Sequence, residues 1–291
     1  MHRVVRQSLQ SIVTPMRKVL QKIEHRISPD VQPNSLSEKL YPTPAAALAD
    51  CRNPEGYDNP DLSAYLIQKS AKYISTFPGA PVAVADHLGH SLLVSLLVAK
   101  SRGRLRAIDF GGGAGVPFAL LRHLLEDSIE ATWHVVEVPS LVEHAQRHLD
   151  VPGLVFSDDL DGSLDTLGQV DLIHTAGTLQ YLDDPRMWLR KLVDIRAPFV
   201  FLGRSAFSEG NIDVIGIQRS RIRDHGPQVD IVDQPSGTIE YPFNYVRRRD
   251  IDAIMTDGGY TTVATFDSES GHRKINDEPI SGGARLYRLS L

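Results

Sequence analysis

A glycine-rich turn after an apolar run is the part of the sequence best suited to hold a ligand. Ile-Asp-Phe at 108–110 leads into Gly-Gly-Gly-Ala-Gly at 111–115, and a helical pattern follows. Glycines at a strand-to-helix turn let a ligand approach the backbone closely. Val116 stands where a dinucleotide fingerprint needs its third glycine, and the Lys-Ser/Thr pair of a P-loop does not follow. The turn therefore suits an adenosyl-amino-acid cofactor, with contacts expected from Asp109, Gly111, Gly113 and Gly115.

Acidic residues end two further predicted strands. The run 133–136 ends at Glu137, whose carboxylate can accept hydrogen bonds from both hydroxyls of a ribose. The run 154–156 precedes Asp158 and Asp159, where an adenine ring would lie in an open α/β sheet. We favour Asp158 for the contact with the base, with Asp159 nearly equal. Each acid has an ordinary alternative, which is to brace a turn, face solvent or cap a loop. Their occurrence together with the glycine turn favours a nucleoside cofactor.

The elements that must position these residues alternate along the chain. From Arg104 onward, β-rich runs alternate with helical runs, which is typical of βαβ units around a mostly parallel sheet. The stretch 210–240 is polar and has no clear periodicity. Asp184 is predicted to cap a helix that begins at Pro185. We expect strands at 105–110, 132–137, 154–156, 170–175, 199–203, 261–266 and 284–291, and helices at 117–126, 139–149, 185–195 and 250–257.

Residues 171–185 (Asp-Leu-Ile-His-Thr-Ala-Gly-Thr-Leu-Gln-Tyr-Leu-Asp-Asp-Pro) resemble the fourth-strand motif of class I methyltransferases, in which the strand ends beside the transferred methyl group. Together with 109–113 and Val-Glu-Val-Pro at 136–139, this motif is similar to a family of methyltransferases assigned mainly by similarity and often linked to polysaccharide gene clusters. The similarity runs from about Pro42 to about Phe266. It includes Gly-Tyr-Asp at 56–58, Gly-Arg-Ser-Ala-Phe at 203–207, Gln218 and Tyr241-Pro242.

The resemblance implies an α/β fold of the Rossmann-like class I type. Its sheet would be mostly parallel and seven-stranded with an antiparallel last strand, and its cofactor would be S-adenosyl-L-methionine. It also implies that Thr175 and Tyr181 contact the cofactor. The chain departs from the family at Gly203 and Ala206, where Asp and Pro are usual, and at 243–245. These positions belong to the expected acceptor side, so either the substrate differs from the family's or activity has been lost.

Methyl transfer from a sulfonium is an in-line displacement, for which holding the two reactants in line is the main task. An alcohol acceptor also needs a base, and His174 is the nearest candidate in the sequence. The alternative, more common for a histidine on a buried strand, is a paired core residue. Arg204 can orient an anionic acceptor such as a phosphate or carboxylate, or form a surface salt bridge. Tyr181 can cover the site or only pack against Trp188.

Composition and charge argue against several classes of protein. A net charge of -5 offers no basic footprint for nucleic acid, which disfavours nucleic acid as a partner, and the small-molecule acceptor is expected from the resemblance. Cys51 is the only cysteine, which rules out an intramolecular disulfide and fits a reducing, cytoplasmic setting. His87 and His90 lack a third ligand, so no metal site is predicted. No stretch has the pattern of a transmembrane segment, and nothing in the sequence favours a particular oligomeric state.

The chain divides into three segments. Residues 1–27 carry six Arg/Lys against Glu24 and form a predicted basic amphipathic helix, suited to dock on the chain's own acidic domain or at a membrane surface. Residues 28–103 read as a Pro-rich linker followed by a helical cap, with helices at 61–77 and 85–100. Residues 104–291 form the expected methyltransferase domain.

Three functions stay open at this point. The first is methylation of a small molecule such as a sugar or cell-envelope intermediate, with O-methylation favoured. The second is a non-catalytic protein that binds the same cofactor. The third is an NAD-dependent oxidoreductase, against which Val116 counts.

Overall fold

The computed structural model describes residues 35–52, 56–78, 81–82, 84–125, 129–232, 234–267 and 273–290. The predicted basic helix at 1–27 lies outside these residues. Within them, none of the helices is both long enough and apolar enough to cross a membrane.

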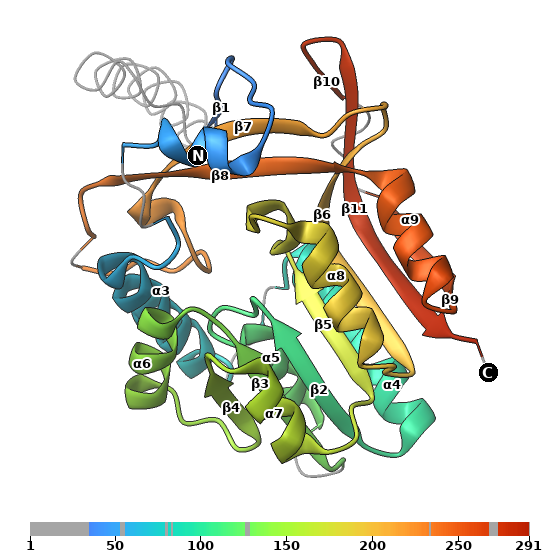
Figure 1. Cartoon of the computed structure of the whole chain (residues 1–291). Helices are drawn as coiled ribbons and strands as arrows, with labels where there is room; N and C mark the ends of the chain where they lie inside the picture. Colours follow the sequence, from blue (N-terminus) through green and yellow to red (C-terminus); the bar gives the residue numbers. More distant parts are fainter. Residues whose placement is uncertain are drawn as a thin grey trace, which may run out of the picture.

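The described strands are joined in one branched, 11-stranded arrangement, and seven of them form the main sheet at the centre of the molecule (Figure 1). Its order is β4-β3-β2-β5-β6-β11-β9, and the first five of these strands are mutually parallel. The last strand of the chain, β11, runs antiparallel to both β6 and β9. The predicted fold class is therefore confirmed. The strands are β2 (Leu105–Phe110), β3 (Ala131–Val136), β4 (Leu154–Ser157), β5 (Leu172–Ala176), β6 (Phe199–Ser208), β9 (Tyr260–Asp267) and β11 (Glu278–Leu289).

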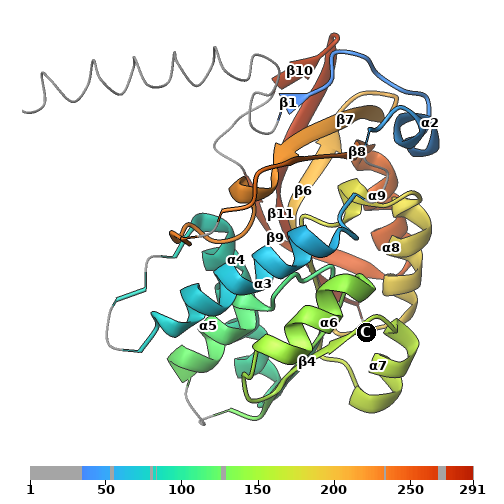
Figure 2. The same cartoon turned by 90° about the vertical axis from the view of Figure 1, so that its left-hand side faces the viewer.

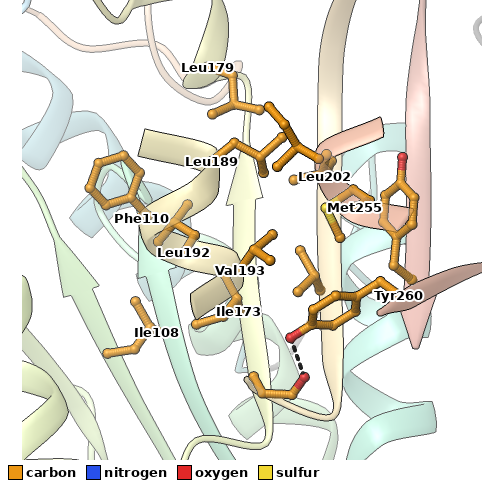
Figure 3. Packing of buried hydrophobic residues seen from close by; sticks show 14 of the residues in the cluster. Ile108, Phe110, Ile173, Leu179, Leu189, Leu192, Val193, Leu202, Met255 and Tyr260 are labelled. Atoms are coloured by element: carbon orange, nitrogen blue, oxygen red, sulfur yellow. Dashed lines mark hydrogen bonds between the residues drawn. The ribbon is translucent and has the colours of Figure 1, made fainter. Parts of the chain in front are cut away.

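Helices cover both faces of this sheet, because its strands are apolar on both sides. Figure 2 shows α4 and α5 on one side and α8 and α9 on the other. The core between the sheet and the face covered by α4 and α5 contains the fully buried Trp133 and Phe118. The core on the opposite face contains Ile108 and Tyr260, whose hydroxyl donates to the carbonyl of Ala197 at 2.7 Å (Figure 3). The first face carries α3 (Pro60–Ser75), α4 (Asp86–Arg102), α5 (Val116–Leu125) and α6 (Pro139–His148), and the second carries α7 (Leu160–Leu167), α8 (Pro185–Asp194) and α9 (Arg248–Asp257).

Helix α8 begins as the sequence predicts. The carboxylate of Asp184 accepts a hydrogen bond from the backbone N–H of Met187 at 2.9 Å, and Pro185 occupies the first turn. A capping carboxylate and an N-terminal proline both favour this start, because they satisfy or remove backbone donors that the helix leaves free.

A second, antiparallel sheet crosses the carboxyl end of the first one (Figure 1). It contains β1 (Ser35–Leu36), β7 (Val214–Arg221) and β8 (Thr238–Arg247). Strand β8 joins the main sheet through the pairs Phe207–Val246 and Ser208–Arg247.

This second sheet corrects the prediction of an aperiodic stretch at 210–240. Strand β7 pairs with β8 along its whole length, and Arg219 forms an ion pair with Glu240 across the two strands at 2.7 Å. Pairing with β8 therefore holds β7 in place, together with the buried Ile215 and Ile217, which pack with Ala47. The predicted linker likewise contains β1 and α2 (Pro44–Ala49), and β6 continues past its predicted end at 203.

Candidate cofactor and acceptor site

The glycine turn is closed on one side and open on the other. Gly111, Gly113 and Gly115 have φ values of 68°, 58° and 64°, which favour glycine. A methyl group added to Gly111 would lie 2.3 Å from the side chain of Thr178, whose hydroxyl donates to the carbonyl of Phe110 at 3.1 Å. A methyl group added to Gly113 would meet no atom within 4 Å. The turn is thus fixed against the end of β5 while its middle is free for a ligand.

Glu137 faces this turn from the end of β3. Its Oε1 accepts a hydrogen bond from the N–H of Gly113 at 2.9 Å, and its Oε2 accepts one from Val138 at 2.9 Å. Burial raises the pKa of the Glu137 carboxyl, and the two N–H donors oppose that rise. Each oxygen retains acceptor capacity. The predicted pairing of an acid with the glycine turn is present, and the carboxylate can still accept two hydroxyl groups.

The two acids after β4 have different surroundings. Asp159 caps α7, because its Oδ1 accepts from the N–H of Asp161 at 3.0 Å. Asp158 is exposed at the strand end, and no partner for it is seen among the described residues. This difference favours Asp158 over Asp159 for contact with a base.

Asp109 lies beneath the glycine turn and not on its open side. It is fully buried, and its Oδ2 accepts from the indole N–H of Trp133 at 2.9 Å. Its Oδ1 lies 2.7 Å from Nδ1 of His174. A methyl group added to Gly112 would lie 2.3 Å from the Asp109 carboxyl carbon. Asp109 therefore supports the turn from within the core. This is the ordinary role of an acid that braces a turn, and not a contact on the open side.

His174 has both ring nitrogens engaged. Its Nδ1 pairs with Asp109, its Nε2 lies 2.9 Å from the hydroxyl of Ser91, and its side chain is 1% exposed. Neither ring nitrogen of His174 is free to take a proton from an acceptor. His174 is therefore a paired core residue, and not a base. Thr175, the next residue of β5, is also buried, and its hydroxyl has no hydrogen-bond partner among the described residues.

Tyr181 belongs to a cluster of aromatic side chains and does not pack against Trp188, which stacks near Phe110 instead. Its ring centroid lies 4.9 Å from that of Tyr57 and 5.2 Å from that of Tyr241. Burial raises the pKa of Tyr181 to about 12, so its hydroxyl stays protonated at neutral pH. We call Tyr57, Tyr181 and Tyr241 the tyrosine cluster. Each of them comes from a different segment of those that resemble the methyltransferase family.

His225 completes this cluster and was not predicted from the sequence. It follows a short 3-10 helix, η2 (Ile222–Asp224), and its ring meets Tyr57 edge-on at 5.8 Å. Its Nε2 lies 2.7 Å from the hydroxyl of Ser220, which lies 2.9 Å from the hydroxyl of Tyr241. Burial lowers the pKa of His225 to about 4, so the ring is neutral at neutral pH. It lies in the stretch that lacks periodicity, so no signal in the sequence marks it.

Arg204 lies between the tyrosine cluster and the end of β5. Its side chain is exposed, and its φ is 47°, in the left-handed region. A methyl group added to Gly177 would lie 3.6 Å from the guanidinium carbon of Arg204. No ion pair of Arg204 is seen within the part of the chain that the structure describes, so the surface salt bridge considered above has no partner there.

The candidate site thus has two halves, which are named after the roles that we propose for them. The cofactor half consists of the glycine turn, Glu137 and Asp158. The acceptor half consists of the tyrosine cluster, His225 and Arg204. In the described residues, no group of three or more His, Cys, Asp or Glu side chains is placed to hold a metal ion.

No protein-family model matches this chain, and no curated protein matches it. Solved structures do match. The N-terminal domain of EvdMO1, determined in the presence of SAH and D-fucose, is 15% identical with a TM-score of 0.46, over 77% of this chain and 96% of that one. SAM-bound CalS10, an amino pentose methyltransferase from Micromonospora echinaspora involved in calicheamicin biosynthesis, is 14% identical with a TM-score of 0.45, over 75% and 96%. The CcbJ methyltransferase from Streptomyces caelestis is 16% identical with a TM-score of 0.43, over 79% and 100%.

Proposed function

We propose that this chain is an S-adenosylmethionine-dependent methyltransferase that acts on a small-molecule acceptor. The observation that carries the proposal is the Glu137 carboxylate, hydrogen-bonded to Gly113 across an open glycine turn. A carboxylate in this place at the end of the second parallel strand is suited to the two hydroxyls of a ribose.

The residues around this carboxylate fit the rest of the cofactor. Asp158 is exposed at the next strand end, where it can accept a hydrogen bond from the amino group of adenine. The open face of Gly113 leaves room for the amino-acid part, and Val116 replaces the glycine that a pyrophosphate would need. The bound cofactor would supply a methyl group already activated as a sulfonium. The task of the protein is then mainly to align the acceptor.

The acceptor half supplies groups for this alignment. Tyr57 and Tyr181 are partly exposed and can meet a polyol, whereas Tyr241 is buried and packs against both of them. Arg204 is close enough for its charge to act on Tyr181 and Tyr241. We therefore propose a sugar-like acceptor that is methylated on oxygen. The proton of that hydroxyl needs a base, and His225 is neutral and belongs to this half, whereas His174 is engaged on both nitrogens.

Calorimetry with S-adenosylhomocysteine (SAH) and with NADH tests the cofactor, and incubation with methyl-labelled S-adenosylmethionine and a panel of sugars tests the reaction. We expect SAH to bind, NADH to give no heat, and label to reach at least one sugar. SAH binding without any transfer or slow hydrolysis would favour the non-catalytic alternative. NADH binding without a response to SAH would overturn the proposal.

A further inference from the structure

A groove of about 870 Å³ opens next to Arg204, between the first turn of α4 and the strands β6 and β11. This volume lies in the range of pockets that hold small molecules. Glycines make much of its wall, and Gly282 and Gly283 are consecutive within β11, where the register with β6 shifts. Glycine inside a strand often marks a place where another group approaches the backbone. The groove therefore forms where glycines, which have no side chain, leave space beside the sheet.

Arg204 is held toward this groove in a strained conformation. A residue other than glycine with φ near 47° is strained, and this conformation persists only where the surroundings impose it. Here the side-chain amide of Gln180 donates to the Arg204 carbonyl at 3.2 Å, and Gly177 leaves space beneath the guanidinium. Such strain clusters at sites that bind ligands.

The charge of Arg204 is free to act on a ligand. Its positive field contributes to the lowered pKa of both His87 and His225, for each of which burial is the main cause. Asp86 is the acid among the groove's lining residues, and it is exposed to solvent, which screens its charge. A guanidinium without a carboxylate partner presents a planar fork of donors that matches a phosphate or carboxylate.

We propose that this groove binds the methyl acceptor and that the acceptor carries an oxyanion, a phosphate or a carboxylate, held by Arg204. The inference rests on the proposed function and narrows its substrate class to acidic or phosphorylated sugar-sized molecules. Arg204 bridges the groove and Gly177, the residue that follows β5. An acceptor anchored there through its oxyanion would place a neighbouring hydroxyl toward the tyrosine cluster.

The test compares matched charged and neutral ligands on the SAH complex at low salt. Calorimetry measures binding of glucose 6-phosphate, glucuronate and glucose to the wild-type chain and to the Arg204→Gln, Arg204→Lys and Arg190→Gln variants. We expect at least one charged ligand to bind about tenfold or more tightly than glucose, because hydrogen bonds between charged groups are the strong ones. Arg204→Gln should abolish this preference, and Arg204→Lys should retain part of it.

Arg190→Gln is the matched control. Arg190 is an exposed arginine of α8 on a different part of the surface, so the variant should keep the full preference. Preference for the phosphate or for the carboxylate identifies which oxyanion the groove takes. Equal binding of charged and neutral ligands, absence of binding by both charged ligands, or a preference that survives in Arg204→Gln would each overturn the inference. Failure of SAH itself to bind would instead overturn the proposed function.

Discussion

The cofactor half and the acceptor half of the site are built in different ways. In the cofactor half, Gly113, Glu137 and Asp158 each follow their own parallel strand, and the Glu137 carboxylate accepts a hydrogen bond from the N–H of Gly113. In the acceptor half, Tyr57 and Tyr241 come from segments far apart in the chain and meet through side-chain packing. A local pattern therefore specifies the first half, whereas the second depends on the pairing of β7 with β8 and on the packing of 56–58 against it.

Two histidines, the buried His174 and the half-buried His225, show the same contrast. His174 pairs on both sides with groups of the core, which leaves it no proton to exchange with a ligand. His225 has a hydroxyl partner, neighbouring aromatic rings and a lowered pKa. His174 is thus a structural histidine, buried and paired on both nitrogens, whereas the half-buried His225 is the candidate base.

The largest effect is expected at Asp109. Replacing it with alanine leaves the buried indole N–H of Trp133 and the ring of His174 without their partner, which should lower the free energy of unfolding by about 3 kcal/mol or more. Urea unfolding measures this change. The matched control is Asp158→Ala, which removes an exposed carboxylate and should change stability by less than about 0.5 kcal/mol. Equal losses in the two variants would contradict the supporting role of Asp109.

The second effect concerns His225 and pH. The ordinary pKa of 6.5 applies to the unfolded chain, and the folded value is about 4. Between these two values, the unfolded chain takes up a proton that the folded chain does not. Stability should therefore fall as the pH falls from about 6.5 to about 4, by about 2 kcal/mol after allowance for partial exposure. Unfolding free energies of the wild type and of His225→Asn, measured across this range, should show a shallower slope for the variant. Parallel slopes would mean that His225 titrates normally.

The third effect tests the cofactor half alone. Glu137→Ala removes the carboxylate proposed to accept both ribose hydroxyls, so SAH affinity should fall by more than about tenfold, or about 1.4 kcal/mol. Tyr181→Phe, in the acceptor half, keeps its ring and serves as the comparison, with SAH affinity changed by less than about threefold. Calorimetry gives both values. A folded Glu137→Ala protein with unchanged affinity would remove this residue from the site.

The smallest effect separates the two acids after β4. Asp158→Asn should weaken SAH binding by about threefold through loss of a charged acceptor for the adenine amino group, while Asp159→Asn should leave it nearly unchanged. Asp159 already caps α7, and asparagine caps a helix about as well as aspartate. The reverse order of effects would assign the base contact to Asp159.

Much of the cofactor half could be predicted because each residue lies in the turn that follows its own strand. Parallel order alone then brings Gly113 and Glu137 to one edge of the sheet. The direction of the Asp109 side chain could not be predicted in the same way. Strand β2 is buried on both faces, so its sequence lacks the alternation that would show which way each residue points.

Arg204 and Tyr181 of the acceptor half were candidates from the sequence, but the way this half is assembled could not be predicted, because its elements are stabilised by partners distant in sequence. Strand β7 is held by ladder bonds to β8 and β1 and by the ion pair of Arg219 with Glu240 of β8. His225 lies between these strands, at the end of a single 3-10 turn. Periodicity reports which faces a segment buries and not the pairing that holds it, so this half emerged only from the folded chain.

A crystal structure of the chain with SAH tests the central claim most directly. We predict that both ribose hydroxyls donate to the Oε atoms of Glu137, that the adenine ring lies beside Asp158, and that the amino-acid part lies over the open face of Gly113. Electron density for SAH in another place, or a ribose without contact to Glu137, would contradict the assignment of this edge of the sheet as a methyltransferase cofactor site.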